Sequence, residues 1–235
     1  MSMILANLQA LQARIGQACD RAGRSRDSVR LLAVSKTFDA EAVRQAWLAG
    51  QRAFGENYVQ EGVEKVQQLQ AAGLSGLEWH CIGPLQSNKT RPVAEHFDWV
   101  HTIDRFKVAQ RLSEQRPAEL PPLQVCVQVN VDGGPNKSGV QPEQALELAQ
   151  AVAALPRLQL RGLMCIPEPA PDFASACAVF GRARALFDAL NERGLALDTL
   201  SMGMSDDLEA AIASGSTLVR VGSAIFGSRH YPASA

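Results

Sequence analysis

A lysine at the end of an apolar run is the residue in this sequence best placed for covalent chemistry. The run covers residues 31–34, and Ser35 and Lys36 follow it. A short apolar run bounded by polar residues predicts a strand buried on both faces, as in parallel α/β sheets. Lys36 would then stand at the carboxyl end of the strand, where α/β barrels carry their chemistry. Loss of hydration favours the neutral amine, which is the form that attacks an aldehyde. The alternative is a solvated lysine, the more common environment of this residue type.

Two turns in the last part of the sequence could bind an anion. Barrels often bind phosphate with the loops that follow strands 7 and 8. The first turn contains Ser201 and Ser205, and Ser205 could either bind an anion or cap the helix that follows it. The second turn, Gly222-Ser223, begins a helix with no acid nearby, so its backbone N–H groups would be open to a phosphate. The sequence therefore favours the second turn.

Arg220 is a charged residue inside an otherwise apolar strand, two positions before Gly222. A buried guanidinium is costly without a partner, which favours an inward position facing a ligand. It stays protonated and only donates, and this suits an acceptor such as an unprotonated ring nitrogen. Asn57 and His80 could face the same mouth. The alternatives are a helix cap for Asn57 and a hydrogen-bonded core position for His80.

Short strands and amphipathic helices alternate along the whole chain, and these elements must position the residues above. An extra helix covers about the first two dozen residues, and Asp104 is expected to cap the helix that carries Phe106. Eight strand-helix units predict α/β architecture, a single (β/α)8 TIM barrel domain spanning residues 1–235. An open doubly wound sheet is the alternative, but it would normally carry a Gly-rich fingerprint after the first strand. The strands are expected near residues 31–36, 52–54, 77–82, 99–102, 124–131, 158–166, 198–201 and 218–221.

The composition limits the classes of partner. The chain has 235 residues and a formal net charge of −1, which indicates neither a nucleic-acid patch nor a basic membrane face. We therefore expect a small-molecule partner, no nucleic acid and no membrane. The five cysteines form no CxxC or His/Cys cluster, so we expect buried free thiols and no metal site. With no leader and no apolar stretch of about 18 residues, a cytoplasmic location is expected.

Several segments, in order along nearly the whole chain, carry a resemblance to a known family. These segments are LAVSK at 32–36, FGENYVQE at 54–61, WHCIGPLQSNK at 79–89, VNV at 129–131, KSG at 137–139, RGLM at 161–164, LSMGMSDD at 200–207 and VRVGSAIFG at 219–227. With them, the sequence resembles the pyridoxal-phosphate homeostasis protein family of the YggS or PROSC type, which is related to the N-terminal barrel domain of bacterial alanine racemases. Members of this family often have a threonine where Ser223 stands here, which keeps the hydroxyl.

The resemblance implies a cofactor and a function. It implies a protein that holds pyridoxal 5′-phosphate (PLP) and acts in PLP (vitamin B6) homeostasis, and indirectly in amino-acid metabolism, without strong catalytic turnover. Apo PLP-dependent enzymes would be the recipients, and the protein is expected to be a monomer. The implied roles are a Schiff base at Lys36, contact with the pyridine nitrogen at Arg220, phosphate binding at Ser205, Gly222 and Ser223, ring contact at Asn57, and a further contact at Ser201.

A PLP-dependent amino-acid racemase is the alternative function. Racemisation needs a proton donor and acceptor on each face of the substrate, and in alanine racemase the second base comes from a partner's C-terminal domain. The sequence ends at Ala235, just past the expected barrel. Arg220 would also leave the pyridine nitrogen unprotonated, which weakens the ring as an electron sink. A structural or partner-binding module is a third class, and it predicts no chromophore.

Overall fold

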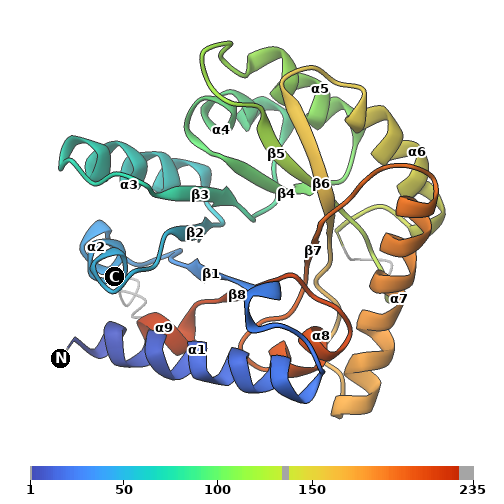
Figure 1. Ribbon diagram of the computed structural model, residues 1–235. Coiled ribbons are helices and arrows are strands. Elements are labelled where there is room, and N and C mark those ends of the chain that lie inside the picture. Colours follow the sequence, from blue (N-terminus) through green and yellow to red (C-terminus); the bar gives the residue numbers. More distant parts are fainter. Residues whose placement is uncertain (1, 134–137, 228–235) are drawn as a thin grey trace, which may run out of the picture.

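The computed structural model describes residues 2–133 and 138–227, and Lys137, which contributes to the family resemblance, lies outside them. Eight parallel strands of the described residues close into a barrel in chain order, with β8 pairing with β1 (Figure 1). The predicted (β/α)8 barrel is confirmed, and the open doubly wound alternative is wrong. The strands are β1 (Arg30–Val34), β2 (Ala53–Glu56), β3 (Glu78–Cys81), β4 (Trp99–Ile103), β5 (Leu123–Gln128), β6 (Leu158–Met164), β7 (Thr199–Ser201) and β8 (Leu218–Val221).

Helices surround the barrel, and the extra N-terminal helix is confirmed (Figure 1). That helix, α1, packs against α2, α8 and α9. Its Asn7 donates to the carbonyl oxygen of Ile225 at 2.9 Å, so it supports the short helix after β8. The helices are α1 (Met3–Arg21), α2 (Ala40–Leu48), α3 (Val59–Ala71), α4 (Thr90–His96), α5 (Phe106–Gln115), α6 (Pro142–Ala153), α7 (Phe173–Glu192), α8 (Leu208–Ala213) and α9 (Ser223–Phe226), with 3-10 turns η1 (Arg26–Ser28) and η2 (Ser87–Lys89). None of these described helices is long and apolar enough to cross a membrane.

Two local expectations are wrong. Asp104 does not cap α5, because its carboxylate instead forms an ion pair with Arg105 at 2.8 Å, and Arg105 occupies the N-cap position. The fifth strand ends at Gln128 rather than at residue 131. The chain leaves the sheet there, and Val129 forms an isolated parallel bridge with Val140.

The apolar core has an outer and an inner part. The large outer cluster joins the helices to the outward-facing side chains of the strands, such as Phe54 and Val100. The barrel interior is filled differently, because side chains alternate across each strand. Two small apolar clusters occupy it: Leu32, Val34, Ala53, Ile82 and Leu218 in one, and Trp99, Cys126 and Met164 in the other. Buried polar residues also occupy interior positions of the strands, among them His80, His101, Ser201 and Arg220.

A glycine allows the turns after β2 and β3 to pack backbone to backbone. A Cβ added at Gly83 would lie 2.0 Å from the carbonyl oxygen of Asn57, which is far inside van der Waals contact. Thr102 also donates to the Gly83 carbonyl oxygen at 2.8 Å. The position of Asn57 therefore depends on the absence of a side chain at residue 83.

We predict that Gly83→Ala lowers the free energy of unfolding by about 1–3 kcal/mol, because overpacking forces the backbone to move. Gly181→Ala is the matched control, since a Cβ on this α7 residue meets nothing within 4 Å. It should stabilise the protein by about 0.5–1 kcal/mol through helix propensity. Urea unfolding of both variants measures these changes. Equal stability of the two variants would contradict the prediction.

Candidate functional site

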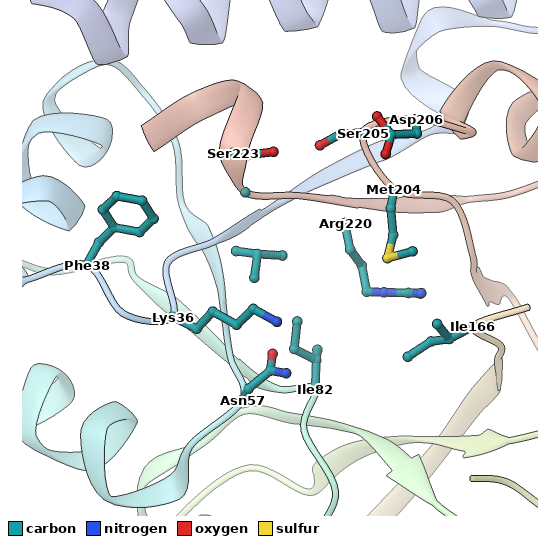
Figure 2. Close-up of a pocket in the computed structure, with 12 residues that line it drawn as sticks. Lys36, Phe38, Asn57, Ile82, Ile166, Met204, Ser205, Asp206, Arg220 and Ser223 are labelled. Atoms are coloured by element: carbon teal, nitrogen blue, oxygen red, sulfur yellow. The ribbon is translucent and has the colours of Figure 1, made fainter. Parts of the chain in front are cut away.

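A cavity of about 270 Å³ opens at the carboxyl ends of the strands (Figure 2). This volume lies near the low end of ligand pockets, which hold roughly 300–1,000 Å³, and so suits a small ligand. Ile82 and Val34 form apolar walls between the polar groups. Six of the seven predicted site residues line the cavity: Lys36, Asn57, Ser205, Arg220, Gly222 and Ser223. The structure therefore brings together residues that are up to 187 positions apart in the sequence, the separation of Lys36 and Ser223.

The buried cation of the site is Arg220 on β8, which is 4% exposed. Its Nη1 donates to Ser201 Oγ at 2.7 Å and its Nη2 donates to the carbonyl oxygen of Cys165 at 3.0 Å. Neither acceptor is an anion, and no carboxylate of the described residues forms an ion pair with it. Burial lowers the pKa of the Arg220 guanidinium, although the nearby Asp207 charge acts in the opposite direction. A buried arginine with only neutral acceptors is unusual and costly unless a ligand completes its environment.

The amine that lines the cavity belongs to Lys36, in the turn after β1. Its side chain is half-buried and extends into the cavity from the opposite side to Arg220, with Asn57 beside it (Figure 2). The next residue, Thr37, has a φ of 67°, which a β-branched residue rarely adopts. Strained backbone of this kind costs about 1–3 kcal/mol and needs support from its surroundings.

A buried ion cluster supplies that support, and sequence reasoning did not find it. Lys65 Nζ on α3 donates to the Ser35 carbonyl oxygen at 2.8 Å, to Glu56 Oε1 at 2.8 Å and to Glu61 Oε1 at 2.6 Å. Glu56 Oε1 also accepts from Ser35 Oγ at 2.5 Å, and Glu61 Oε1 accepts from the Thr37 backbone N–H at 2.6 Å. The cluster thus holds the residues on both sides of Lys36. The i,i+4 spacing of Glu61 and Lys65 on a helix was the available signal.

Two hydroxyl groups face each other at the other end of the cavity, those of Ser205 and Ser223 (Figure 2). Neither has a hydrogen-bond partner among the described residues. The capping alternative for Ser205 is wrong, because Asp207 occupies the N-cap position of α8 and its Oδ1 accepts from the Met204 N–H at 2.6 Å. The two hydroxyls are therefore available to a ligand.

Asn57 and Gly222 complete the lining. Asn57 does not cap α3, whose N-cap residue is Tyr58, and its amide faces the cavity. A Cβ on Gly222 would approach the Val34 carbonyl oxygen to 2.9 Å. The glycine is therefore required by the close approach of the first and last strands, besides any contact with an anion.

Ser201 is placed differently from the other predicted residues, and so is His80. Ser201 is fully buried, does not line the cavity, and contacts His101 Nδ1 at 2.9 Å as well as Arg220. His80 is also fully buried in the barrel interior, with its Nδ1 2.8 Å from His101 Nε2. For His80 the hydrogen-bonded core alternative is confirmed. The described residues contain no group of three His, Cys, Asp or Glu side chains that could hold a metal ion.

Comparison with known proteins identifies the family. The profile of the alanine racemase N-terminal domain matches residues 6–230. The pyridoxal phosphate homeostasis protein of Pseudomonas aeruginosa is 60% identical over 235 residues, which is 100% of both chains. The Escherichia coli K12 protein of the same name is 56% identical over 231 residues, covering 98% of this chain and 99% of that protein. This chain belongs to the pyridoxal phosphate homeostasis protein family.

Solved structures of the family have the same fold. PipY of Synechococcus elongatus with PLP bound is 37% identical, with a TM-score of 0.82, covering 95% of this chain and 100% of that one. Alanine racemase of Corynebacterium glutamicum is 19% identical, with a TM-score of 0.71, and the match covers 95% of this chain and 60% of the racemase chain. At that identity the likeness to the racemase shows a shared fold alone.

We predict that Lys65→Met destabilises the protein by about 3–5 kcal/mol at pH 8, because it leaves the Glu56 carboxylate buried without a counter-charge. Burial raises the pKa of Glu56 even with Lys65 present. A carboxyl whose folded pKa lies above its unfolded value stabilises the fold when protonated and loses that contribution as the pH rises. The loss should therefore be smaller at pH 5 than at pH 8.

Denaturant unfolding at both pH values measures the effect. The matched control is Lys107→Met, an exposed α5 residue that forms no ion pair with the described residues, and it should change stability by less than about 0.5 kcal/mol. A loss for Lys65→Met that is the same at both pH values would show that Glu56 does not carry the effect.

Proposed function

We propose that this chain binds PLP in the cavity of Figure 2, attaches it covalently at Lys36, and acts as a carrier in PLP homeostasis. The observation that carries the proposal is that Lys36 and Arg220 line the same cavity. An amine and a buried guanidinium without an anionic partner face the same small cavity from opposite sides. Full-length relatives at 56–60% identity are named for PLP homeostasis, and the PipY structure has PLP bound. These findings support the same assignment.

The described residues fit three functional groups of PLP, namely its aldehyde, its ring nitrogen and its phosphate. The cofactor supplies an aldehyde that condenses with a primary amine, and the Lys36 turn offers that amine beside the apolar walls of Val34 and Ile82. Arg220 can only donate, so it suits an unprotonated ring nitrogen. The hydroxyls of Ser205 and Ser223, with the backbone of Gly222, suit the phosphate oxygens. We propose that Asn57 contacts the side of the pyridine ring of PLP.

Ser201 acts through Arg220 in this proposal. Its hydroxyl lies behind the guanidinium rather than in the cavity, and it accepts one of the five arginine N–H groups at 2.7 Å. It therefore orients the arginine instead of contacting the cofactor. This refines the role of a direct ligand that the family resemblance implied.

The cavity favours a carrier over a racemase. Besides Lys36, a racemase needs a second proton donor and acceptor on the opposite face of its substrate. The described residues that line the cavity include no tyrosine, histidine or cysteine, and their one carboxylate is Asp206. Figure 2 places Asp206 beside Ser205, at the end of the cavity away from Lys36. Each missing acid or base typically lowers the rate about 10²–10⁴-fold.

The setting of the protein forms part of the proposal. We propose a cytoplasmic monomer, a single domain over residues 1–235, that passes PLP to apo PLP-dependent enzymes. Burial raises the pKa of the free thiols of Cys81, Cys126 and Cys165 to about 12, and such unreactive, unpaired cysteines suit a reducing compartment. Transfer of PLP to an added apo-enzyme, followed by recovery of that enzyme's activity, tests the recipient.

We predict that Lys36→Ala abolishes the near-visible absorbance of bound PLP while the protein remains folded, because no other described lysine lines the cavity. Borohydride reduction followed by peptide mapping should place the pyridoxyl label on Lys36 in the unmodified protein. Lys107→Ala, on the exposed surface of α5, is the control and should keep the full absorbance. A label found mainly on another lysine would overturn the assignment of Lys36.

We also predict that the PLP-loaded protein exchanges little α-hydrogen of L-alanine or L-serine for deuterium over hours in heavy water. The reason is the absence of an opposing acid or base near Lys36 among the cavity-lining residues that the structure describes. Mass spectrometry and chiral chromatography measure exchange and racemisation. Turnover in the usual enzyme range of about 1–10³ per second would restore the racemase.

A further inference from the structure

A line of hydrogen bonds crosses the barrel interior from Arg220 to the opposite end of the strands. Arg220 Nη1 lies 2.7 Å from Ser201 Oγ, which lies 2.9 Å from His101 Nδ1. His101 Nε2 lies 2.8 Å from His80 Nδ1, and His80 Nε2 lies 2.7 Å from Glu78 Oε1. The five residues come from β3, β4, β7 and β8, and Glu78 is the first residue of β3. The line therefore connects the cavity with the rim at the amino ends of the strands.

The end of the line at Glu78 fixes the direction of its hydrogen bonds. Although burial acts to raise the pKa of Glu78, the hydrogen bond from His80 and the ion pair with Arg30 at 2.7 Å keep that pKa below its ordinary value. The carboxylate is thus ionised and can only accept, so His80 Nε2 carries a proton and donates to it. Burial lowers the pKa of both His80 and His101, which keeps both imidazoles neutral.

The direction then propagates one residue at a time. A neutral His80 that is protonated on Nε2 has an unprotonated Nδ1, which can only accept, so His101 Nε2 must donate to it. His101 Nδ1 is then also bare and must accept the Ser201 hydroxyl hydrogen. The Ser201 oxygen in turn accepts from Arg220, which cannot act as an acceptor. The Arg220 end is compatible with this order, because the Ser201 oxygen accepts from the obligatory donor and its hydrogen remains free to donate to His101.

We propose that Ser201, His101, His80 and Glu78 are positioning residues for Arg220, linked in a one-way chain in which every hydrogen bond donates away from the cavity. This proposal rests on the proposed function, because it assigns Arg220 to the ring nitrogen of PLP. The chain orients the guanidinium and does not conduct protons, since arginine does not release its proton in proteins.

The surroundings hold the chain in place. His80 stacks on Trp99 with ring centroids 5.2 Å apart and an interplanar angle of 11°. The Arg161 guanidinium lies 4.9 Å from the centroid of the same indole ring on β4. His80, His101 and Ser201 are all fully buried, so water cannot substitute for a missing link. Cooperative polarisation along such a chain strengthens each of its bonds.

The first test is the tautomer of each histidine, measured by long-range nitrogen-15 NMR on the protein without PLP at neutral pH. We expect His80 and His101 both to be protonated on Nε2 and bare on Nδ1. A proton on Nδ1 of either residue, or an imidazolium at either position, would overturn the one-way chain. The outcome of this tautomer measurement does not depend on whether the protein binds PLP.

The second test changes the far end of the chain, outside the cavity. Glu78→Leu removes the acceptor of His80 and should produce a mixture of His80 tautomers. It should also weaken PLP retention about 2- to 10-fold, the effect of losing one net hydrogen bond. Glu78→Gln is the conservative control, because its amide oxygen still accepts, and it should restore both the wild-type tautomers and PLP retention.

Wild-type PLP retention in Glu78→Leu would overturn the positioning role. If the histidine tautomers are as expected but the wild-type protein binds no PLP at all, the proposed function fails and the role toward the cofactor fails with it. The order of the hydrogen bonds would then stand as a property of the barrel alone, so the two failures are distinguishable.

Discussion

The burial of the Arg220 guanidinium is the constraint around which the site is organised. A charge in the barrel interior loses most of its hydration, and acceptors must replace the lost water. Ser201 and the Cys165 carbonyl oxygen replace only part of it. The guanidinium also lines the cavity, on the side opposite Lys36. The protein thus leaves the polar environment of this arginine incomplete at a cavity that a ligand can enter.

The two sides of the cavity are held by different physical means. On the lysine side, a cluster of formal charges at Lys65, Glu56 and Glu61 holds a strained turn. On the arginine side, a line of neutral side chains holds the guanidinium, and its only formal charges are at its two ends. Buried ion clusters tolerate little change because each charge depends on another. A line of hydrogen-bonded neutral side chains tolerates substitutions only where the order of donors and acceptors is kept.

Much of the fold and half of the residues that line the cavity could be predicted from sequence. The alternation of strands and helices predicts a barrel, and a barrel places the carboxyl ends of all strands at one rim. Lys36, Arg220 and Ser223 follow from that rule because each is at a strand end or just beyond one. The Lys65 cluster could not be predicted, since helical lysines are normally solvated. Ser201 is predicted as a cavity residue but lies behind Arg220, because strand position alone does not give the depth at which a side chain ends.

The close approach of Gly222 to Val34 has a consequence for when the site can exist. Lys36 follows the first strand and Gly222 follows the last, and β1 and β8 meet at the seam that closes the barrel. During synthesis, Lys36 leaves the ribosome early, but its counterparts on β8 follow only after more than 180 further residues. A nascent chain therefore has the amine without the guanidinium of Arg220 or the turn at Gly222 and Ser223. Under the proposed function, PLP capture must wait for barrel closure, and the bound cofactor then bridges the seam and links the two ends of the fold.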